Sequence, residues 1–425
     1  MNIVSDTKLF SKTLIFYFAF GFLFPSLRVL LIGHETAVGI VQYFVASLPE
    51  LLLLSIIIHT GIQAIKSAER FKLNLFDWII LGFAGSNVLL GFFLAGNLKL
   101  SLYAFRMSYL PFVFYFLIRL YNFKEDDLKK TIYYIFISTA SLVLIGHIMY
   151  FLMPNLMIEM IVKFGGMVTS YFIVRMTSIL WTPVVFGTFA ASGFLYFYYH
   201  TIENDKWSNY ILMALMWSGL LLSVSRGAII ALLIGLIVFS CISFRLKPVI
   251  KTLGIMTLVF IALGYYINTP AEFAQWIWSS SMDTLHLKKG LTRVELWAKA
   301  FDDFKERPFG YGLGMAGHVA ARFLSSSQEN TDVYSTDGWF LKLANETGIW
   351  GLLSYLILAG TYFIMTVKKI KQSKNILLTF LLVFFIAFNI QSMVSNTLDF
   401  YLFSNLFWLM MGIGINQYYK PELGK

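Results

Sequence analysis

Long apolar runs alternate with short polar or charged segments along the whole chain. Twelve of these runs are long enough to cross a membrane as α-helices, since a helix rises about 1.5 Å per residue and a hydrocarbon core is about 30 Å thick. The predicted spans are residues 13–32, 37–62, 76–96, 100–119, 131–152, 177–199, 209–225, 227–244, 250–267, 340–366, 376–395 and 398–416. The pattern predicts an all-α polytopic membrane protein.

The stretch from Asn209 to Phe244 is apolar throughout and needs separate treatment. As one helix it would be about 54 Å long, far beyond one hydrocarbon core. Two spans joined by a tight turn at Ser225-Arg226-Gly227 fit better, because glycine permits a turn and arginine prefers the interface to the membrane centre.

Composition supports the membrane class. Hydrophobic residues make up 58% of the chain and charged residues 13%, where soluble globular proteins have about 45–50% and about 25%. These values exclude a soluble multidomain protein, and the abundance of Phe, Tyr and Trp excludes a disordered or fibrous chain.

The net charge of +10 is explained by topology rather than by nucleic acid. With twelve spans the loops alternate sides, and Lys and Arg concentrate in the short loops on the side of the two termini. The positive-inside rule then places both termini in the cytoplasm. Along the chain we expect nine spans in residues 1–267, a large outer loop in 268–339, and three spans with a cytoplasmic C-terminus in 340–425.

The large outer loop is expected to contain an amphipathic helix. Thr292 and Glu295 form a capping-box pattern at its start, and Pro308 stops it. Such a helix would lie on the membrane surface or cap the bundle. A second, shorter outer segment covers residues 154–176.

Several familiar sites are not supported by the sequence. The single cysteine, Cys241, allows no intrachain disulfide and no cysteine metal site, and the six histidines lack metal-ligand spacing. The run Phe309–Gly314 resembles a phosphate loop, but no strand precedes it and no Gly-Lys-Ser/Thr follows, which indicates a turn. His147 is expected to pack or to hydrogen-bond between helices. No cleavable signal peptide is predicted.

Five arginines map to the predicted outer side, where the positive-inside rule gives no reason for them. An arginine at membrane depth costs about 2.5–3.5 kcal/mol on insertion scales, and its guanidinium suits bidentate contact with phosphate. Each one alone could reach lipid headgroups or pair with Glu35 or Glu159; together they favour a shared anionic ligand. The five are Arg28, Arg106, Arg175, Arg226 and Arg293.

Four motifs, in order and all on the predicted outer face, resemble those of the O-antigen ligase/O-antigen polymerase superfamily of bacterial envelope glycosyltransferases. The resemblance covers about residues 170–360. The motifs are an arginine segment ending in Thr182-Pro183, Ser225-Arg-Gly-Ala228, Arg293-Val-Glu-Leu-Trp297 followed by Arg307-Pro-Phe-Gly-Tyr-Gly-Leu-Gly314, and Asp337-Gly-Trp-Phe-Leu followed by Glu346-Thr-Gly348.

This resemblance implies a GT-C-like, metal-independent glycosyltransferase of the bacterial inner membrane that uses no cofactor. Its donor would be an oligosaccharide linked to undecaprenyl diphosphate, and its active site would be periplasmic. Membrane lipids and a chain-length regulator of the Wzz type are the expected partners. Ligases of the superfamily carry His-Asn where this chain has Asp337-Gly338, and that departure favours a polysaccharide polymerase over a ligase acting on lipid A–core.

The resemblance also implies residue roles. Arg175, Arg226 and Arg293 would stabilise the diphosphate leaving group, with Arg106 and Arg28 as further diphosphate-binding residues. Asp337 is the candidate general base, although it could instead cap the following helix, and Glu346 is expected to be structural. A transporter or flippase of lipid-linked glycan is the alternative of another class, but the sequence lacks the repeat symmetry typical of transporters; a non-catalytic scaffold also stays open.

Overall fold

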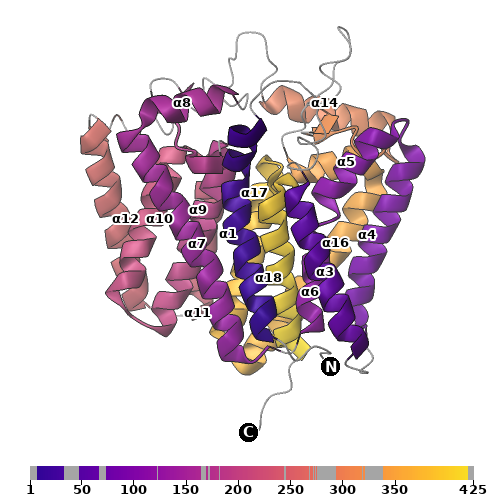
Figure 1. The fold of residues 1–425 in the computed structure, drawn as a ribbon, viewed down its shortest axis with the longest axis horizontal. Helices are drawn as coiled ribbons and strands as arrows, with labels where there is room; N and C mark the ends of the chain where they lie inside the picture. The colour runs from indigo at the N-terminus through magenta and orange to yellow at the C-terminus, as the bar shows by residue number, and fades with distance from the viewer. Residues whose placement is uncertain are drawn as a thin grey trace. The chain divides into compact units, whose positions relative to one another are not determined.

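The computed structural model describes residues 7–32, 47–66, 73–121, 123–163, 169–170, 173–180, 182–243, 246–267, 269–270, 272, 274, 293–317, 319–320 and 338–419. These residues are almost entirely helical, so the all-α prediction is confirmed (Figure 1). The chain forms two compact units, Met1–Phe71 with Arg119–Ser280 and Lys72–Ile118 with Ser281–Lys425, called unit 1 and unit 2. The expected division at residues 267 and 339 stays a prediction.

Unit 1 is a bundle of long helices with one short strand pair. Strands β1 (Thr169–Ser170) and β2 (Ile173–Val174) are antiparallel, with Thr169 opposite Val174. The helices are α1 (Thr7–Ile32), α3 (Leu48–Lys66), α7 (Glu125–Leu152), α8 (Pro154–Lys163), η1 (Ser178–Leu180), α9 (Pro183–Glu203), α10 (Trp207–Ser223), α11 (Arg226–Ser243) and α12 (Leu246–Ile267).

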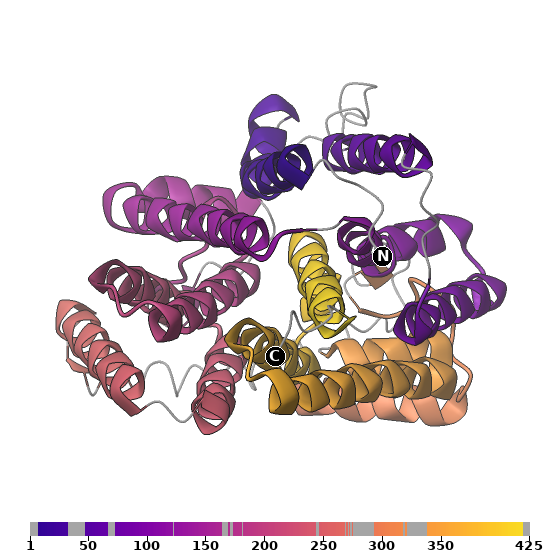
Figure 2. The same cartoon turned by 90° about the horizontal axis from the view of Figure 1, so that it is seen from below.

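Helix α9 is the centre of unit 1 and packs against α7, α10, α11 and α12. Every residue of α9 from Phe186 to Tyr199 is buried, as expected for a helix that is hydrophobic on all sides. Figure 2 looks along the helices and shows α7, α10 and α12 side by side within this unit. A small cluster of Met149, Met157 and Ile161 fastens α8 across the end of α7.

The other end of unit 1 carries exposed or half-buried ion pairs. Lys129 Nζ lies 2.8 Å from Glu203 Oε1, and Lys251 Nζ lies 2.7 Å from Asp205 Oδ2. Exposed pairs of this kind contribute only about 0–1 kcal/mol each. These two ion pairs show that charged side chains gather at this end of unit 1.

Unit 2 contains the remaining helices. They are α4 (Leu75–Leu94), α5 (Leu98–Ser108), α6 (Phe112–Leu120), α14 (Arg293–Glu306), α16 (Trp339–Ser373), α17 (Ile376–Val394), η3 (Thr397–Asp399) and α18 (Tyr401–Tyr419). Helix α16 packs against α4, α14, α17 and α18, so it connects the unit. Within unit 2, Figure 1 shows α14 at the end of the bundle opposite the C-terminal end of α18.

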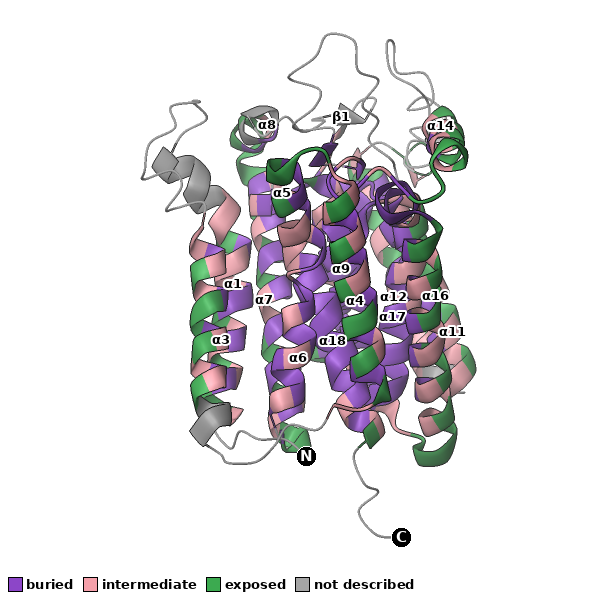
Figure 3. Ribbon diagram, turned by 90° about the vertical axis from the view of Figure 1, so that its right-hand side faces the viewer, coloured by how far each residue is buried: buried purple, intermediate pink, exposed green. Residues whose placement is uncertain are grey.

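The helix α4 shows how the apolar pattern divides between protein and lipid. Phe76, Ile80 and Phe83 are buried along one stripe, whereas Trp78, Leu89 and Phe93 are exposed. Figure 3 shows the exposed and buried faces of this helix. Large apolar side chains on the outer face are unfavourable in water but suit a lipid environment.

A helix or a bent pair of helices lies in every one of the predicted spans. Among the described residues, seven helices are long and apolar enough to cross a membrane, and the α5–α6 pair makes an eighth candidate. The fold is therefore that of an all-α polytopic membrane protein. The amphipathic helix expected in residues 268–339 is confirmed as α14, which ends before Pro308.

Three boundaries differ from the prediction. The span expected at 37–62 is described only from Leu48, where α3 begins. The span expected at 100–119 is two helices at 44°, because Pro111 lacks the N–H that a continuous helix needs. The span expected at 340–366 is broken at Gly348, whose φ of 68° and ψ of −156° are not helical.

The division of residues 209–244 into two helices is confirmed, but the turn lies slightly earlier than expected. Helix α10 ends at Ser223, and α11 begins at Arg226. Val224, not Gly227, has the left-handed conformation, with φ of 53° and ψ of 33°. Gly227 is instead part of the first turn of α11.

Candidate functional site

In unit 1, the turn between α10 and α11 is held by the segment that follows β2. Arg175 Nε donates to the carbonyl oxygen of Ser223 at 2.9 Å, and Nη2 donates to that of Val224 at 3.4 Å. The backbone N–H of Met176 donates to the Leu222 carbonyl at 3.0 Å. The guanidinium thus satisfies carbonyls at the C-terminal end of α10, where positive charge is favourable.

These contacts explain how Val224, a β-branched residue, is kept in a left-handed backbone conformation. Such a conformation costs about 1–3 kcal/mol and persists only where neighbouring structure enforces it. Val224 is buried, and its flanking carbonyls are held by Arg175 and Met176. The sharp turn places half-buried Arg226 at the N-terminus of α11, where the helix dipole also favours an anion.

The structure therefore places two of the predicted arginines at one turn. Arg175 holds the carbonyls at the end of α10, and Arg226 begins α11. Arg106 belongs to the last turn of α5 in unit 2, with its guanidinium 5.8 Å from the centroid of the Tyr103 ring. Arg293 is the first residue of α14, but its side chain lies outside the described residues. The side chain of Arg28 and all of Asp337 also lie outside them.

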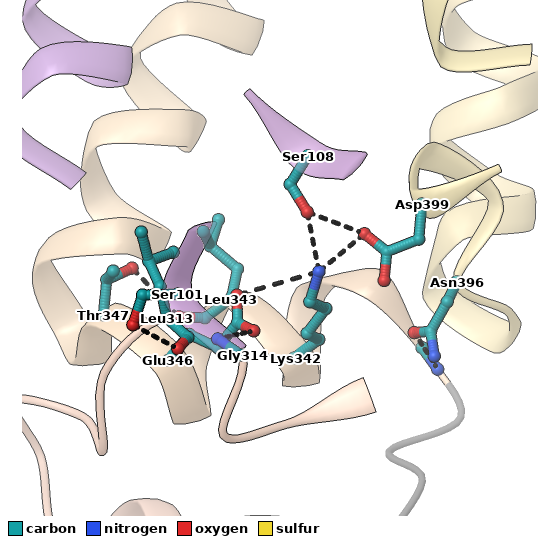
Figure 4. A network of polar contacts seen from close by, with 11 residues as sticks. Ser101, Ser108, Leu313, Gly314, Lys342, Leu343, Glu346, Thr347, Asn396 and Asp399 are labelled. Carbon is teal, nitrogen blue, oxygen red and sulfur yellow. Dashed lines mark hydrogen bonds and ion pairs between the residues drawn. The ribbon is translucent and has the colours of Figure 1, made fainter. Parts of the chain in front are cut away.

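Unit 2 contains a buried polar network that the sequence analysis missed (Figure 4). Lys342 Nζ lies 2.7 Å from Asp399 Oδ1 and donates to Ser108 Oγ at 2.7 Å. Ser108 Oγ in turn donates to the same Asp399 oxygen at 3.0 Å. Lys342 and Asp399 are only 1% and 3% exposed, so their charges depend on each other.

Glu346 extends this network to the glycine-rich loop of residues 308–314. Its Oε2 lies 3.7 Å from Lys342 Nζ, and its Oε1 accepts a hydrogen bond from the backbone N–H of Gly314 at 2.9 Å. Glu346 thus makes the hydrogen bond expected of it.

The backbone N–H groups of the glycine-rich loop are used within the protein. Tyr311 donates to the Asn345 carbonyl, Gly312 to the Glu346 carbonyl, and Leu313 to the Gly91 carbonyl, at 2.8–3.0 Å. A phosphate loop would instead direct such groups toward its ligand. The interpretation of this run as a turn is confirmed.

One signal in the sequence could have revealed part of the network. Lys342 and Glu346 are four residues apart inside a predicted span, and ionisable groups inside a membrane usually have partners and a function. No spacing connects Asp399 or Ser108 to them, because these residues are 57 and 234 positions from Lys342.

The start of α16 is defined by Gly338, which follows the candidate base. Gly338 is the N-cap residue and makes no side-chain cap, so the alternative that Asp337 is the N-cap is not supported. Its φ is 131°, and a Cβ at this position would lie 2.7 Å from the carbonyl oxygen of Met393. Only glycine fits this backbone, since other residues rarely adopt this φ.

Two further predictions concern single side chains. His147 Nε2 lies 2.7 Å from Ser218 Oγ, which joins α7 to α10 and confirms the expected helix–helix hydrogen bond. Asp302 on α14 is exposed and forms an ion pair with Lys305 at 3.0 Å. In the part of the chain that the structure describes, no group of three or more His, Cys, Asp or Glu residues has metal-site geometry.

The comparison with protein families agrees with the motifs. Residues 211–356 match the family model described as O-antigen ligase. This segment begins in α10 and ends in α16, and it includes Arg226, Arg293, Asp337 and Glu346. No curated protein sequence matches the chain significantly. Within residues 211–356, the chain is similar to the O-antigen ligase family.

Proposed function

We propose that the protein is a polysaccharide polymerase. It transfers a growing glycan from undecaprenyl diphosphate to a sugar hydroxyl of another lipid-linked repeat unit. The observation that carries the choice of polymerase is the backbone at Gly338. The asparagine of the ligase His-Asn pair would place its Cβ 2.7 Å from the Met393 carbonyl oxygen at a φ that suits glycine, so this backbone disfavours the ligase residue at position 338.

The proposed reaction forms one glycosidic bond and breaks one bond to phosphate. The acceptor oxygen attacks the anomeric carbon of the donor glycan, the diphosphate leaves with the carrier lipid, and the acceptor proton passes to the Asp337 carboxylate. Arginines stabilise the negative charge on the leaving diphosphate, as preorganised cations do for transferring phosphate groups. This mechanism requires no metal and no cofactor.

The proposed arginine roles rest on where each residue lies. Arg175 follows β2 and donates to the Ser223 carbonyl at the α10–α11 turn, and Arg226 begins α11 after the same turn. Arg293 begins a helix that lies at the end of unit 2 opposite the C-terminal end of α18. We assign Arg106 and Arg28 to the same diphosphate-binding function on their predicted outer positions.

We further propose that the protein lies in the bacterial inner membrane with both termini in the cytoplasm and the active site in the periplasm. The charge pattern supports this orientation: Lys368, Lys369, Lys371 and Lys374 follow the membrane part of α16, and such clusters stay on the cytoplasmic side. Lipid-linked oligosaccharide and a chain-length regulator of the Wzz type are the proposed partners.

Deletion of the gene in its host tests the function directly. A polymerase mutant should retain lipid A–core with a single repeat unit on a gel of surface glycan, since ligation is intact. The family description favours a ligase as the second candidate, and a ligase mutant would instead show bare core and long glycan on the carrier lipid. An unchanged glycan ladder would contradict both.

A further inference from the structure

Two segments of unit 1 meet where each has an unusual backbone conformation. Val224, in the turn between α10 and α11, and Ser178, at the start of η1, are non-glycine residues with φ of 53° and 52°. The segments are joined by Arg175 and Met176, which bond the end of α10 and its turn. Strained backbone of this kind persists only where its surroundings enforce it, and it clusters at functional sites.

Both sides of this contact are fixed to the bundle within unit 1. Ser178 is buried, and its Oγ donates to the Leu142 carbonyl of α7 at 2.8 Å. On the other side, the turn packs against α9 at Gly187, where a Cβ would lie 2.5 Å from Ser225 Cβ. Arg175 therefore bonds the turn from a segment that is itself held in place.

The guanidinium of Arg175 recognises the shape of the turn. Its Nε and Nη2 donate to the carbonyls of two successive residues, Ser223 at 2.9 Å and Val224 at 3.4 Å. Successive carbonyls of an extended chain point to opposite sides, so one guanidinium reaches both only because the chain turns here. The two bonds thus favour the left-handed conformation of Val224 over the extended conformation that suits valine.

The conformation of Val224 sets where α11 begins. Arg226 lies two residues later and is the first residue of α11, and the backbone N–H of Ile229 already donates to the Ser225 carbonyl at 3.0 Å. The helix therefore starts directly after the turn, and a change of φ or ψ at Val224 would move Arg226 with it. Arg226 is half-buried, so such a movement would change the surroundings of its guanidinium.

We propose that Arg175 is a positioning residue for Arg226. By holding Val224 in its left-handed conformation, Arg175 keeps Arg226 in place to bind the leaving diphosphate. This role adds to the diphosphate contact already proposed for Arg175. The inference rests on the proposed function, because it needs Arg226 to bind the diphosphate, and a displacement of about 1 Å at such a contact can slow a reaction by about 100-fold.

Val224→Gly separates this role from direct contact, because glycine takes the left-handed conformation at no steric cost. For other residues that conformation costs about as much as a tenfold change in rate. Arg175→Ala is made in the native sequence and in the Val224→Gly background, and each rate is compared with that of its own parent. Transfer is measured in proteoliposomes with the polyprenyl-diphosphate glycan extracted from the deletion host, and rates are divided by the amount of protein that is monodisperse on size-exclusion chromatography.

We expect the loss caused by Arg175→Ala to be about tenfold smaller in the Val224→Gly background than in the native sequence. Lys374→Gly is the matched control, since Lys374 also has a left-handed conformation, with φ of 51°, but follows α16 in unit 2. In the Lys374→Gly background, the loss caused by Arg175→Ala should equal the loss in the native sequence.

A further background, Arg226→Ala, distinguishes positioning of Arg226 from a general effect on the fold. There, Val224→Gly should no longer reduce the loss caused by Arg175→Ala, since residues that act through one another are not additive. A reduction of the same size with and without the Arg226 side chain would overturn the inference, because Arg175 would then act on the fold alone.

Two other results would contradict different claims. If the loss caused by Arg175→Ala shrank by less than about fivefold in the Val224→Gly background, the positioning role would be overturned and the proposed function would stand. Full transfer by Arg226→Ala alone would remove Arg226 from the diphosphate site of the proposed function, and the positioning role with it.

Discussion

The backbone N–H of Ile349 donates a hydrogen bond to the carbonyl oxygen of Pro308 at 2.8 Å. This bond replaces one that a continuous α16 would make within itself, and it joins the break at Gly348 to the glycine-rich loop. The segments around Pro308 and Gly348 therefore form one hydrogen-bonded structure within unit 2.

Gly348→Ala should destabilise the protein by about 1–3 kcal/mol or more, because the backbone conformation of Gly348 is essentially restricted to glycine. A Cβ there would also overlap the Pro308 carbonyl oxygen. Thermal unfolding of the detergent-purified variant measures the effect. Gly360→Ala is the control in the same helix, since a Cβ at Gly360 has no atom within 4 Å and should be neutral or stabilising. Equal unfolding temperatures for the two variants would contradict the interlock.

Lys342→Met should destabilise the protein by about 3–5 kcal/mol, because it leaves the buried carboxylate of Asp399 without its countercharge. The double variant Lys342→Met with Asp399→Leu should recover part of this loss, since Asp399 then no longer leaves a buried charge and Glu346 keeps its hydrogen bond from the Gly314 N–H. The measurement is again the unfolding temperature, compared across both single variants and the double. If the double variant lost as much stability as the two single variants together, the loss in Lys342→Met would not come from breaking the ion pair.

Arg175→Ala should lower glycan polymerisation by about 10²–10³-fold, which is the usual effect of losing one stabilising donor to developing negative charge. Arg175→Lys should restore little, because lysine cannot reproduce the fork that contacts Ser223 and Val224. Glycan length in the complemented deletion strain and the amount of protein in the membrane are measured together. Lys206→Ala, at an exposed position in unit 1, is the control. Full-length glycan with Arg175→Ala would exclude a role in the reaction.

The single cysteine makes the proposed orientation easy to test. In a Cys241→Ser background, Asp302→Cys on α14 should react with a membrane-impermeant maleimide in cells whose outer membrane has been permeabilised. Lys374→Cys at the end of α16 should react only after the inner membrane is also opened. Both positions are exposed. The reverse labelling pattern would show that the protein has the opposite orientation in the membrane.

The sequence predicted the fold well where long-range contacts were not needed. Hydrophobic length located a helix in each expected span, and Pro308 predicted the end of α14. The breaks at Pro111 and Gly348 were missed, because both lie inside apolar runs of ordinary length. Hydropathy measures how apolar a run is and does not report its backbone conformation.

The candidate site was predicted only in part for a related reason. Arginine is unusual beside a predicted apolar span, so Arg175 and Arg226 stood out in the sequence, and the structure places both at the α10–α11 turn. The network of Lys342, Asp399 and Ser108 depends on packing between α5, α16 and the α17–α18 loop, and no sequence spacing encodes that packing. Val224 was also missed, since a valine gives no signal for a left-handed turn.

The break at Gly348 has a consequence for how the bundle opens. The carbonyls of Asn345 and Glu346 accept hydrogen bonds from the glycine-rich loop, whereas residues 349–373 continue as an uninterrupted helix whose first N–H, that of Ile349, donates to the Pro308 carbonyl. Cooperative opening follows hydrogen-bonded contacts rather than continuity of the chain. In amide hydrogen exchange, the short first segment should therefore lose protection together with residues 308–314, and not with the rest of its own helix.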